Sequence, residues 1–127
     1  MQFLTPTMQL PPYMAFPRFL LDKVQLSETA KIIYMLLLDR ARLSMKNDGW
    51  SDEHGHVFIY FTISDMATVL HKSEMTIKNC LSSLEYADLI HRKRQGIGIP
   101  NRIYVKVPRT DYLQTDKKLS TREIENY

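Results

Sequence analysis

The most constraining feature of this sequence is a pair of short helical segments joined by only a few residues. Ser64 can cap the first segment, in which apolar side chains recur at helical spacing, and Ser73 can cap the second. In the second segment, Ile77, Leu81 and Leu84 lie at positions i, i+4 and i+7, so they share one face. Two capped helices joined by a tight turn predict a helix-turn-helix.

Two strand-like runs follow this helix pair. They span residues 89–94 and 102–107, and the loop between them, residues 95–101, contains glycine, proline and asparagine, which suit a hairpin tip. An earlier run at residues 56–61 is rich in Val, Ile, Phe and Tyr and supplies a third strand. The chain is therefore predicted to be an α+β protein, a winged helix-turn-helix with a small antiparallel sheet.

The chain before the helix pair begins with a proline-containing arm. Residues 1–21 hold four prolines among aromatic and methionine residues, with Arg18 as their only charged side chain. Four prolines exclude a continuous helix, so we expect an extended apolar arm that packs either on its own domain or on another subunit. After the arm, Ser27 followed by Glu28 predicts a capped helix over about residues 28–43.

These segments divide the chain into three parts. We expect the arm at residues 1–21, the winged-helix domain at residues 22–107, and a polar linker or tail at residues 108–127. Inside the domain, the Asn-Asp-Gly sequence at residues 47–49 predicts a turn after the long helix.

Positive charge is concentrated in the predicted hairpin. The chain has 17 basic and 14 acidic residues, and its net charge of +3 alone would barely favour a polyanionic partner. Residues 89–109, however, contain six basic residues and no acidic residue. The hairpin is thus the part of the chain that is suited to phosphate contacts.

The second helix of the pair is polar on the face opposite Ile77 and Leu81. Asparagine can form two hydrogen bonds with adenine, lysine can reach guanine or phosphate, and methionine can contact a thymine methyl group. An ordinary surface helix is also polar outward, and a basic hairpin alone is usually a solvated surface, but the order of all three features favours DNA binding.

We therefore expect residues 74–86 to be a recognition helix in the major groove, and residues 92–102 to be a wing on the DNA backbone or in the minor groove. The residues expected to contact double-stranded DNA are Lys72, Ser73, Met75, Thr76, Lys78, Asn79, Ser82, Arg92, Lys93, Arg94, Gln95, Asn101 and Arg102.

Other functional classes have little support in the sequence. No phosphate-binding loop motif occurs, and a polar turn entering a strand explains the acidic and histidine cluster at residues 52–56 better than a metal site does. Cys80 is expected to be a buried small side chain, and Trp50 a core anchor. We expect no enzymatic activity, cofactor or metal and, without a long apolar run, no membrane contact and a cytoplasmic location.

Three runs of the sequence resemble the N-terminal domain of the RepA-type bacterial plasmid replication initiators. The resemblance covers roughly residues 13–107 and implies a winged-helix domain that binds repeated sites at a replication origin, usually as a dimer. Host replication proteins would be contacted only by a separate C-terminal region. The first run is Leu37-Leu38-Asp39-Arg40-x-x-Leu43-Ser44-x-Lys46-Asn47-x-Gly49-Trp50-x-Asp52-x-x-Gly55. The second is Ile59-Tyr60-Phe61-Thr62, and the third is Leu89-Ile90-x-Arg92-Lys93-Arg94-Gln95-Gly96-x-Gly98-x-Pro100-Asn101-x-Ile103-Tyr104-Val105.

Two departures from the family pattern matter. Ile99 stands where the family often has a lysine in the wing, which removes one phosphate contact. The sequence also ends at Tyr127 without the C-terminal region, so we expect either a fragment or a stand-alone DNA-binding domain.

The sequence thus favours a homodimer, to which the arm contributes, bound to origin repeats of a plasmid or mobile element. Two alternatives stay open. The same surface would serve a winged-helix transcriptional regulator, and winged helices also act as protein-interaction modules.

Overall fold

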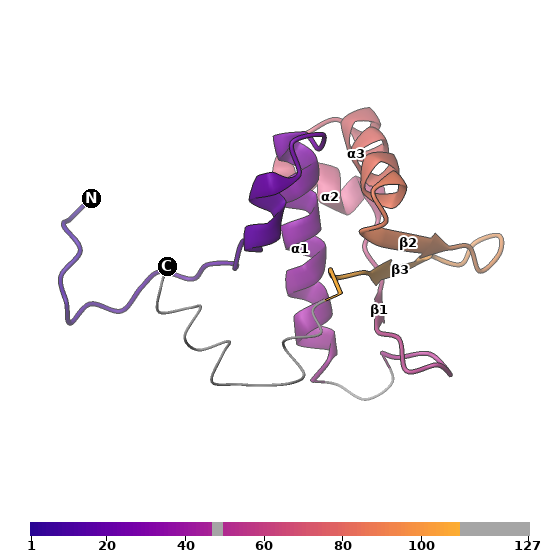
Figure 1. The fold of residues 1–127 in the computed structure, drawn as a ribbon, viewed down its shortest axis with the longest axis horizontal. Helices are drawn as coiled ribbons and strands as arrows, with labels where there is room; N and C mark the ends of the chain where they lie inside the picture. The colour runs from indigo at the N-terminus through magenta and orange to yellow at the C-terminus, as the bar shows by residue number, and fades with distance from the viewer. Residues whose placement is uncertain (47–49, 110–127) are drawn as a thin grey trace.

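The computed structural model describes residues 1–46 and 50–109, and its fold confirms the predicted α+β class (Figure 1). The predicted turn at residues 47–49 and all but the first two residues of the predicted tail lie outside the described residues. The elements in chain order are η1 (Arg18–Asp22), α1 (Glu28–Ser44), β1 (Phe58–Ile59), α2 (Ile63–Leu70), α3 (Glu74–Tyr86), β2 (Ile90–Lys93) and β3 (Arg102–Val105).

Side-chain caps fix where the helices begin. Ser27 Oγ accepts a hydrogen bond from the Ala30 amide at 3.1 Å, so α1 begins at the predicted residue. Ser73 Oγ accepts one from the Thr76 amide at 3.1 Å, and α3 has its predicted bounds.

The start of α2 was predicted two residues too late. Thr62, not Ser64, is its N-cap, because the Thr62 hydroxyl accepts a hydrogen bond from the Asp65 amide at 3.0 Å. Ser64 lies inside the helix, where its carbonyl accepts a hydrogen bond from the Thr68 hydroxyl at 3.0 Å. The cap moves because β1 ends at Ile59 and the chain enters the helix at Ile63, directly after Thr62.

A tight left-handed turn joins α2 to α3. His71 has a φ of 55°, and its amide donates to the Ala67 carbonyl. The Lys72 amide donates to the same carbonyl at 3.1 Å. These two hydrogen bonds satisfy a carbonyl group at the end of α2, and the left-handed residue sets the direction in which α3 begins.

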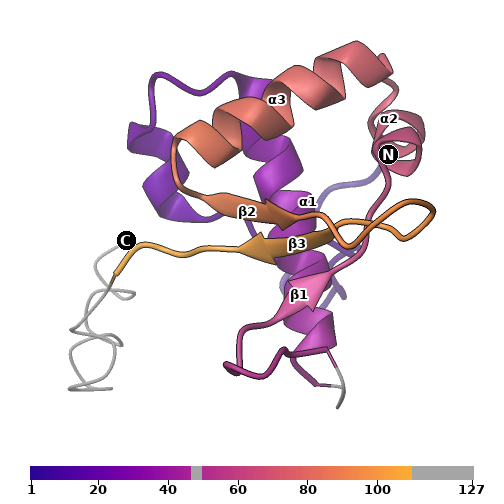
Figure 2. The ribbon, with the colours of Figure 1, turned by 90° about the vertical axis from the view of Figure 1, so that its right-hand side faces the viewer.

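The sheet has the antiparallel order β1-β3-β2. In its register Ile59 pairs with Ile103, whereas Phe58 and His91 both pair with Tyr104. Because paired residues point to the same side of a sheet, the isoleucines share the inner face and the three ring-bearing residues share the outer face. Figure 2 shows α1 behind the sheet and α3 above β2.

The first strand is much shorter than the predicted run at residues 56–61. Val57 forms an isolated bridge with Ser51, and the Phe58 amide donates to the Trp50 carbonyl at 3.0 Å, so the chain before Phe58 is paired with the preceding loop. The other two strands are also shorter than predicted by one or two residues at their ends.

The core lies between the inner face of the sheet and the helices. Leu20, Tyr34, Leu37, Met66 and Leu84 are fully buried in it. Cys80 is buried as predicted, with its sulfur 3.8 Å from Ser27 Oγ.

Trp50 does not belong to this core, and its prediction as a core anchor was wrong. It is partly buried, and it packs on the outer face of the sheet. Its ring centroid lies 6.3 Å from that of Phe58 and 6.0 Å from that of Tyr60. The cause is the strand register, which turns Phe58 and Tyr60 away from the helices.

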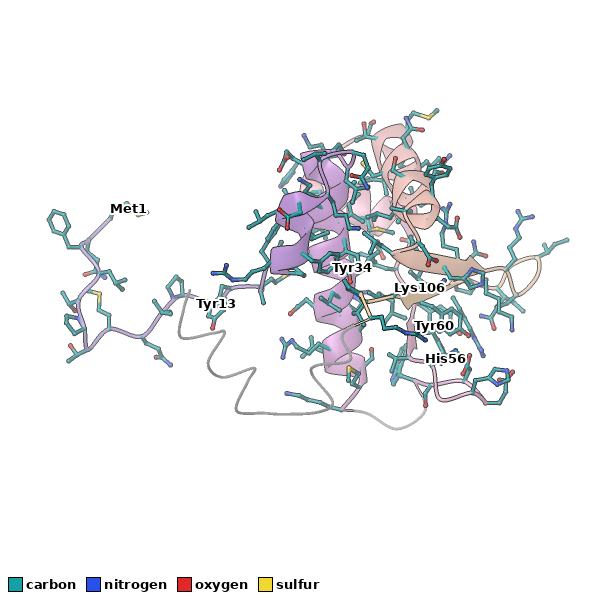
Figure 3. The ribbon with its side chains drawn as sticks, viewed as in Figure 1. Met1, Tyr13, Tyr34, His56, Tyr60 and Lys106 are labelled. Atoms are coloured by element: carbon teal, nitrogen blue, oxygen red, sulfur yellow. The ribbon has the colours of Figure 1, made fainter. Side chains whose placement is uncertain are left out.

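The N-terminal arm separates into an exposed part and an anchored part. Residues 1–16 extend away from the domain, as Figure 3 shows between Met1 and Tyr13. Phe19, by contrast, lies edge-on to the Tyr34 ring at 5.5 Å, and Leu20 is buried. Packing of the whole arm on its own domain is therefore not what the structure shows, and packing on another subunit stays a prediction.

Among residues 1–46 and 50–109, the helices are all too short or too polar to span a bilayer.

Candidate functional site

The outward face of α3 is polar and solvent-exposed. Ile77, Leu81 and Leu84 hold the other side of the helix in the core. Lys78, Asn79 and Ser82 are exposed, and within the described residues their side chains have no hydrogen-bond or ion-pair partner. With Met75, which is 65% exposed, they form a surface that is free to meet a ligand.

Two of the hydroxyl groups expected at this site are already engaged. Ser73 Oγ caps α3 and lies 2.9 Å from Thr76 Oγ1. Thr76 is only partly exposed, whereas Lys72 beside it is exposed. Ser73 and Thr76 thus shape the start of the helix, and Lys72 extends the outward polar face.

Arg92 points to the inner face of the sheet rather than to solvent. Its Nη2 lies 3.0 Å and its Nε 3.2 Å from Glu85 Oε1, and its amide donates to Glu85 Oε2 at 3.0 Å. Burial alone would raise the pKa of the Glu85 carboxyl. The hydrogen bonds from Arg92 and its positive charge outweigh this effect, so the pKa of Glu85 is lowered. The pair fixes β2 against α3.

Replacing Arg92 with alanine is expected to lower the free energy of unfolding by about 1–2 kcal/mol. The partly buried Glu85 carboxylate would lose both guanidinium hydrogen bonds and keep only the amide. Urea unfolding followed by circular dichroism measures this. Arg94→Ala is the matched control, because Arg94 is exposed and has no partner among the described residues. Equal stability of the two variants would contradict the structural role of Arg92.

The wing is braced at its base. Gln95 Nε2 donates to the Pro100 carbonyl at 3.0 Å and to Tyr60 Oη at 3.1 Å, which closes the loop and ties it to the sheet. Lys93 and Arg94 on one side of the loop and Asn101 on the other are exposed. The wing therefore carries its cationic groups on a fixed stem.

Arg102 lies flat on the outer face of the sheet. Its guanidinium carbon is 4.1 Å from the centre of the Phe58 ring, a cation–π contact. Hydrogen bonds with Tyr104 and Tyr60 raise the pKa of Arg102. Arg102 is thus held on the side of the sheet that faces away from α3.

The predicted DNA-contacting residues therefore separate into two sets. One set is exposed on two neighbouring elements, α3 and the hairpin formed by β2 and β3, and Figure 2 shows α3 above β2. Ser73, Thr76, Arg92, Gln95 and Arg102 have intramolecular partners that position these elements.

The acidic and histidine cluster forms a turn. Asp52 Oδ1 accepts from the amides of His54 at 2.9 Å and His56 at 3.0 Å, and Oδ2 accepts from Tyr104 Oη at 3.0 Å. These bonds, the His56 amide first, lower the pKa of Asp52 to about 2. In the described part of the chain, no group of three or more His, Cys, Asp or Glu residues could hold a metal ion.

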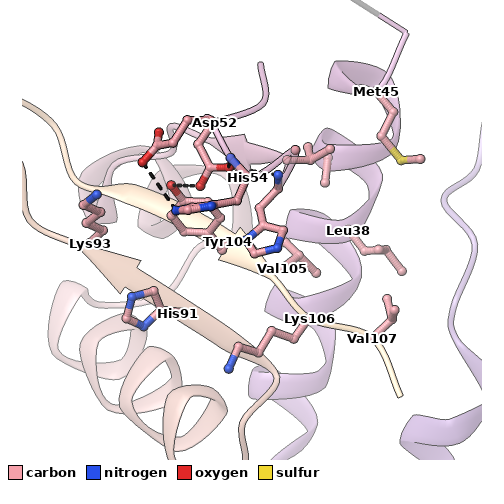
Figure 4. A pocket seen from close by; sticks show the side chains of 15 residues that line it. Leu38, Met45, Asp52, His54, His91, Lys93, Tyr104, Val105, Lys106 and Val107 are labelled. Carbon is pink, nitrogen blue, oxygen red and sulfur yellow. Dashed lines mark hydrogen bonds and ion pairs between the residues drawn. The ribbon is translucent and has the colours of Figure 1, made fainter. Parts of the chain in front are cut away.

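Sequence reasoning missed a groove of about 850 Å³ on the outer face of the sheet, which Lys93 of the wing stem also lines (Figure 4). It runs between the C-terminal half of α1, the loop at residues 52–57 and the outer face of β2 and β3. Leu38, Met45 and Val107 supply apolar walls, and His54 and His91 also line the groove. No local pattern signals it, because its walls come from four separate segments.

Comparisons with known proteins connect this chain to one family. Residues 12–118 match the family described as replication initiator protein A (RepA) N-terminus. A "41 kDa protein" of Lactobacillus helveticus is 33% identical over 105 residues, covering 76% of this chain. This chain spans only 30% of that relative's length.

Three solved structures are similar in fold. An N-terminal domain of a DNA binding protein and a Rep-DNA complex each have a TM-score of 0.67 and 25% identity. Both alignments cover 91% of this chain, with 86% and 87% of the respective neighbour. A structure titled MDR initiator has a TM-score of 0.64 and 26% identity, covering 99% of this chain and all of that one.

Proposed function

Because this chain belongs to the family of replication initiator protein A N-terminal domains, we propose that it binds double-stranded DNA sequence-specifically at a plasmid or mobile-element replication origin. The observation that carries the proposal is that unpartnered polar side chains are exposed on α3, next to a hairpin whose stem carries exposed cations; Figure 2 shows α3 above β2. A solved neighbour in complex with DNA supports the same assignment. The proposed role is binding rather than catalysis.

The dimensions of the two elements fit a duplex. The 13 residues of α3 make a helix of about 20 Å, and a major groove about 12 Å wide admits such a helix. With α3 in the groove, Lys78, Asn79 and Ser82 face base edges. Lys93 and Arg94 then meet phosphates or the adjacent minor groove.

Selection from a random duplex pool followed by fluorescence anisotropy tests this function. The selected duplex is expected to bind at least about a thousandfold more tightly than a shuffled duplex of the same composition. Equal, weak binding to both would contradict sequence-specific recognition. Iterated copies of the selected sequence at an origin would support initiation, and single copies at promoters would support the regulatory alternative.

We further propose that the protein binds repeated sites as a homodimer to which the arm contributes. Phe3, Leu10 and Tyr13 are exposed on the arm, and a contiguous apolar surface of this kind is unusual in a monomer. We also propose that contacts with host replication proteins lie outside the domain described above, since this chain spans only 30% of the length of its longer relative.

Deleting residues 1–12 is expected to shift the protein from dimer to monomer in analytical ultracentrifugation. The fold should persist, because the deleted residues lie outside the core. A circular dichroism melting curve checks that the shortened protein is folded. An unchanged sedimentation mass would show that the arm is not needed for dimerisation.

A further inference from the structure

The tip of the wing is apolar, although its stem is cationic. Ile97 is fully exposed, and Ile99 two residues later is 53% exposed. Lys93 and Arg94 precede them, and no acidic residue occurs between residues 89 and 109. The exposed Ile97 therefore stands at the end of a hairpin whose charged residues are all basic.

The backbone of the wing holds Ile97 outward. The Ile99 amide donates to the Gly96 carbonyl at 3.3 Å and closes a turn in which Ile97 and Gly98 are the central residues. Gly98 has a φ of +77°, which a type II turn requires at its second central position. With the loop base closed by Gln95, the Ile97 side chain stands at the corner of a braced turn.

We propose that Ile97 is a wedge that enters the minor groove of the bound duplex, partly unstacks one base step and bends the DNA. This inference rests on the proposed function. Apolar side chains inserted from the minor groove bend duplexes in this way, while cations beside them neutralise the flanking phosphates. Lys93 and Arg94 are placed on the stem for that second role.

The same chemistry predicts where the wedge acts. Pyrimidine–purine steps unstack most easily, so the preferred site should carry one beside the base pairs read by α3. The wing would then contribute to sequence preference through the deformability of the DNA, without a hydrogen bond to a base.

The experiment measures bending and binding on the same selected duplex, labelled at both ends for fluorescence energy transfer. Wild-type protein is expected to bend the duplex by about 20–90°. Ile97→Ala should remove most of the bend and should also remove the fluorescence rise of a 2-aminopurine placed at the pyrimidine–purine step. Ile99→Ala, the same change two residues away, should keep both signals.

The results separate this inference from the proposed function. A duplex that is bound tightly but stays straight, or one that Ile97→Ala bends as the wild type does, would overturn the wedge and leave DNA recognition intact. Failure to select any preferred duplex would overturn the proposed function, and the wedge with it. Both substitutions lie on an exposed loop, and their unfolding midpoints should equal that of the wild type.

Discussion

Replacing Leu84 with alanine is expected to lower the free energy of unfolding by about 2–5 kcal/mol. Leu84 has 0% of its surface exposed and lies on the inward face of α3, within the core shared with α1 and the sheet. The substitution removes apolar contacts and leaves a cavity that neighbouring side chains fill only in part. The free energy of unfolding of a native protein is only about 5–15 kcal/mol, so this substitution would remove a large share of it.

Urea unfolding followed by far-ultraviolet circular dichroism measures this loss. Val69→Ala on α2 is the matched control, because Val69 is 53% exposed and its truncation should cost only about 0.5 kcal/mol. If Leu84→Ala cost no more than Val69→Ala, α3 would not be anchored to the core as the structure describes.

Helix starts were largely predictable from the sequence because caps are local. Ser27 and Ser73 each bond to an amide three residues ahead, and that spacing can be read from the sequence. Thr62 and Ser64 were both suitable caps for α2. The choice between them depends on where the chain leaves the sheet, which is a tertiary property.

The site was only half predictable, for a related reason. Helical periodicity identifies the outward face of α3, because one buried stripe fixes the opposite side. In the hairpin, by contrast, Arg92, Lys93 and Arg94 look alike in sequence. Strand register turns Arg92 inward to Glu85 and leaves its neighbours exposed, and that register depends on pairing with β3.

The groove and the arm show a further limit of prediction from the sequence. The walls of the groove come from segments far apart in sequence, so no local pattern reports them. The apolar residues of the arm were visible in the composition of residues 1–21, but composition does not tell whether they pack on the domain.

Replacing Asn79 with alanine is expected to weaken binding to the selected duplex by about 1–3 kcal/mol, which is about 5- to 150-fold, and to leave binding to the shuffled duplex unchanged. Asn79 is exposed near the middle of α3, and its side-chain amide has no partner among the described residues. That amide is therefore free to form two hydrogen bonds with an adenine. Fluorescence anisotropy titrations on both duplexes measure the effect.

Arg94→Ala provides the contrast that gives this measurement its meaning. Arg94 lies on the exposed wing stem, so its loss should weaken binding to both duplexes alike and reduce the salt dependence of binding by about one phosphate contact. Asn79→Ala should leave the salt dependence unchanged, because an amide releases no counterion. If Asn79→Ala weakened binding to both duplexes equally, the polar face of α3 would contact only the DNA backbone. Another part of the protein would then have to recognise the DNA sequence.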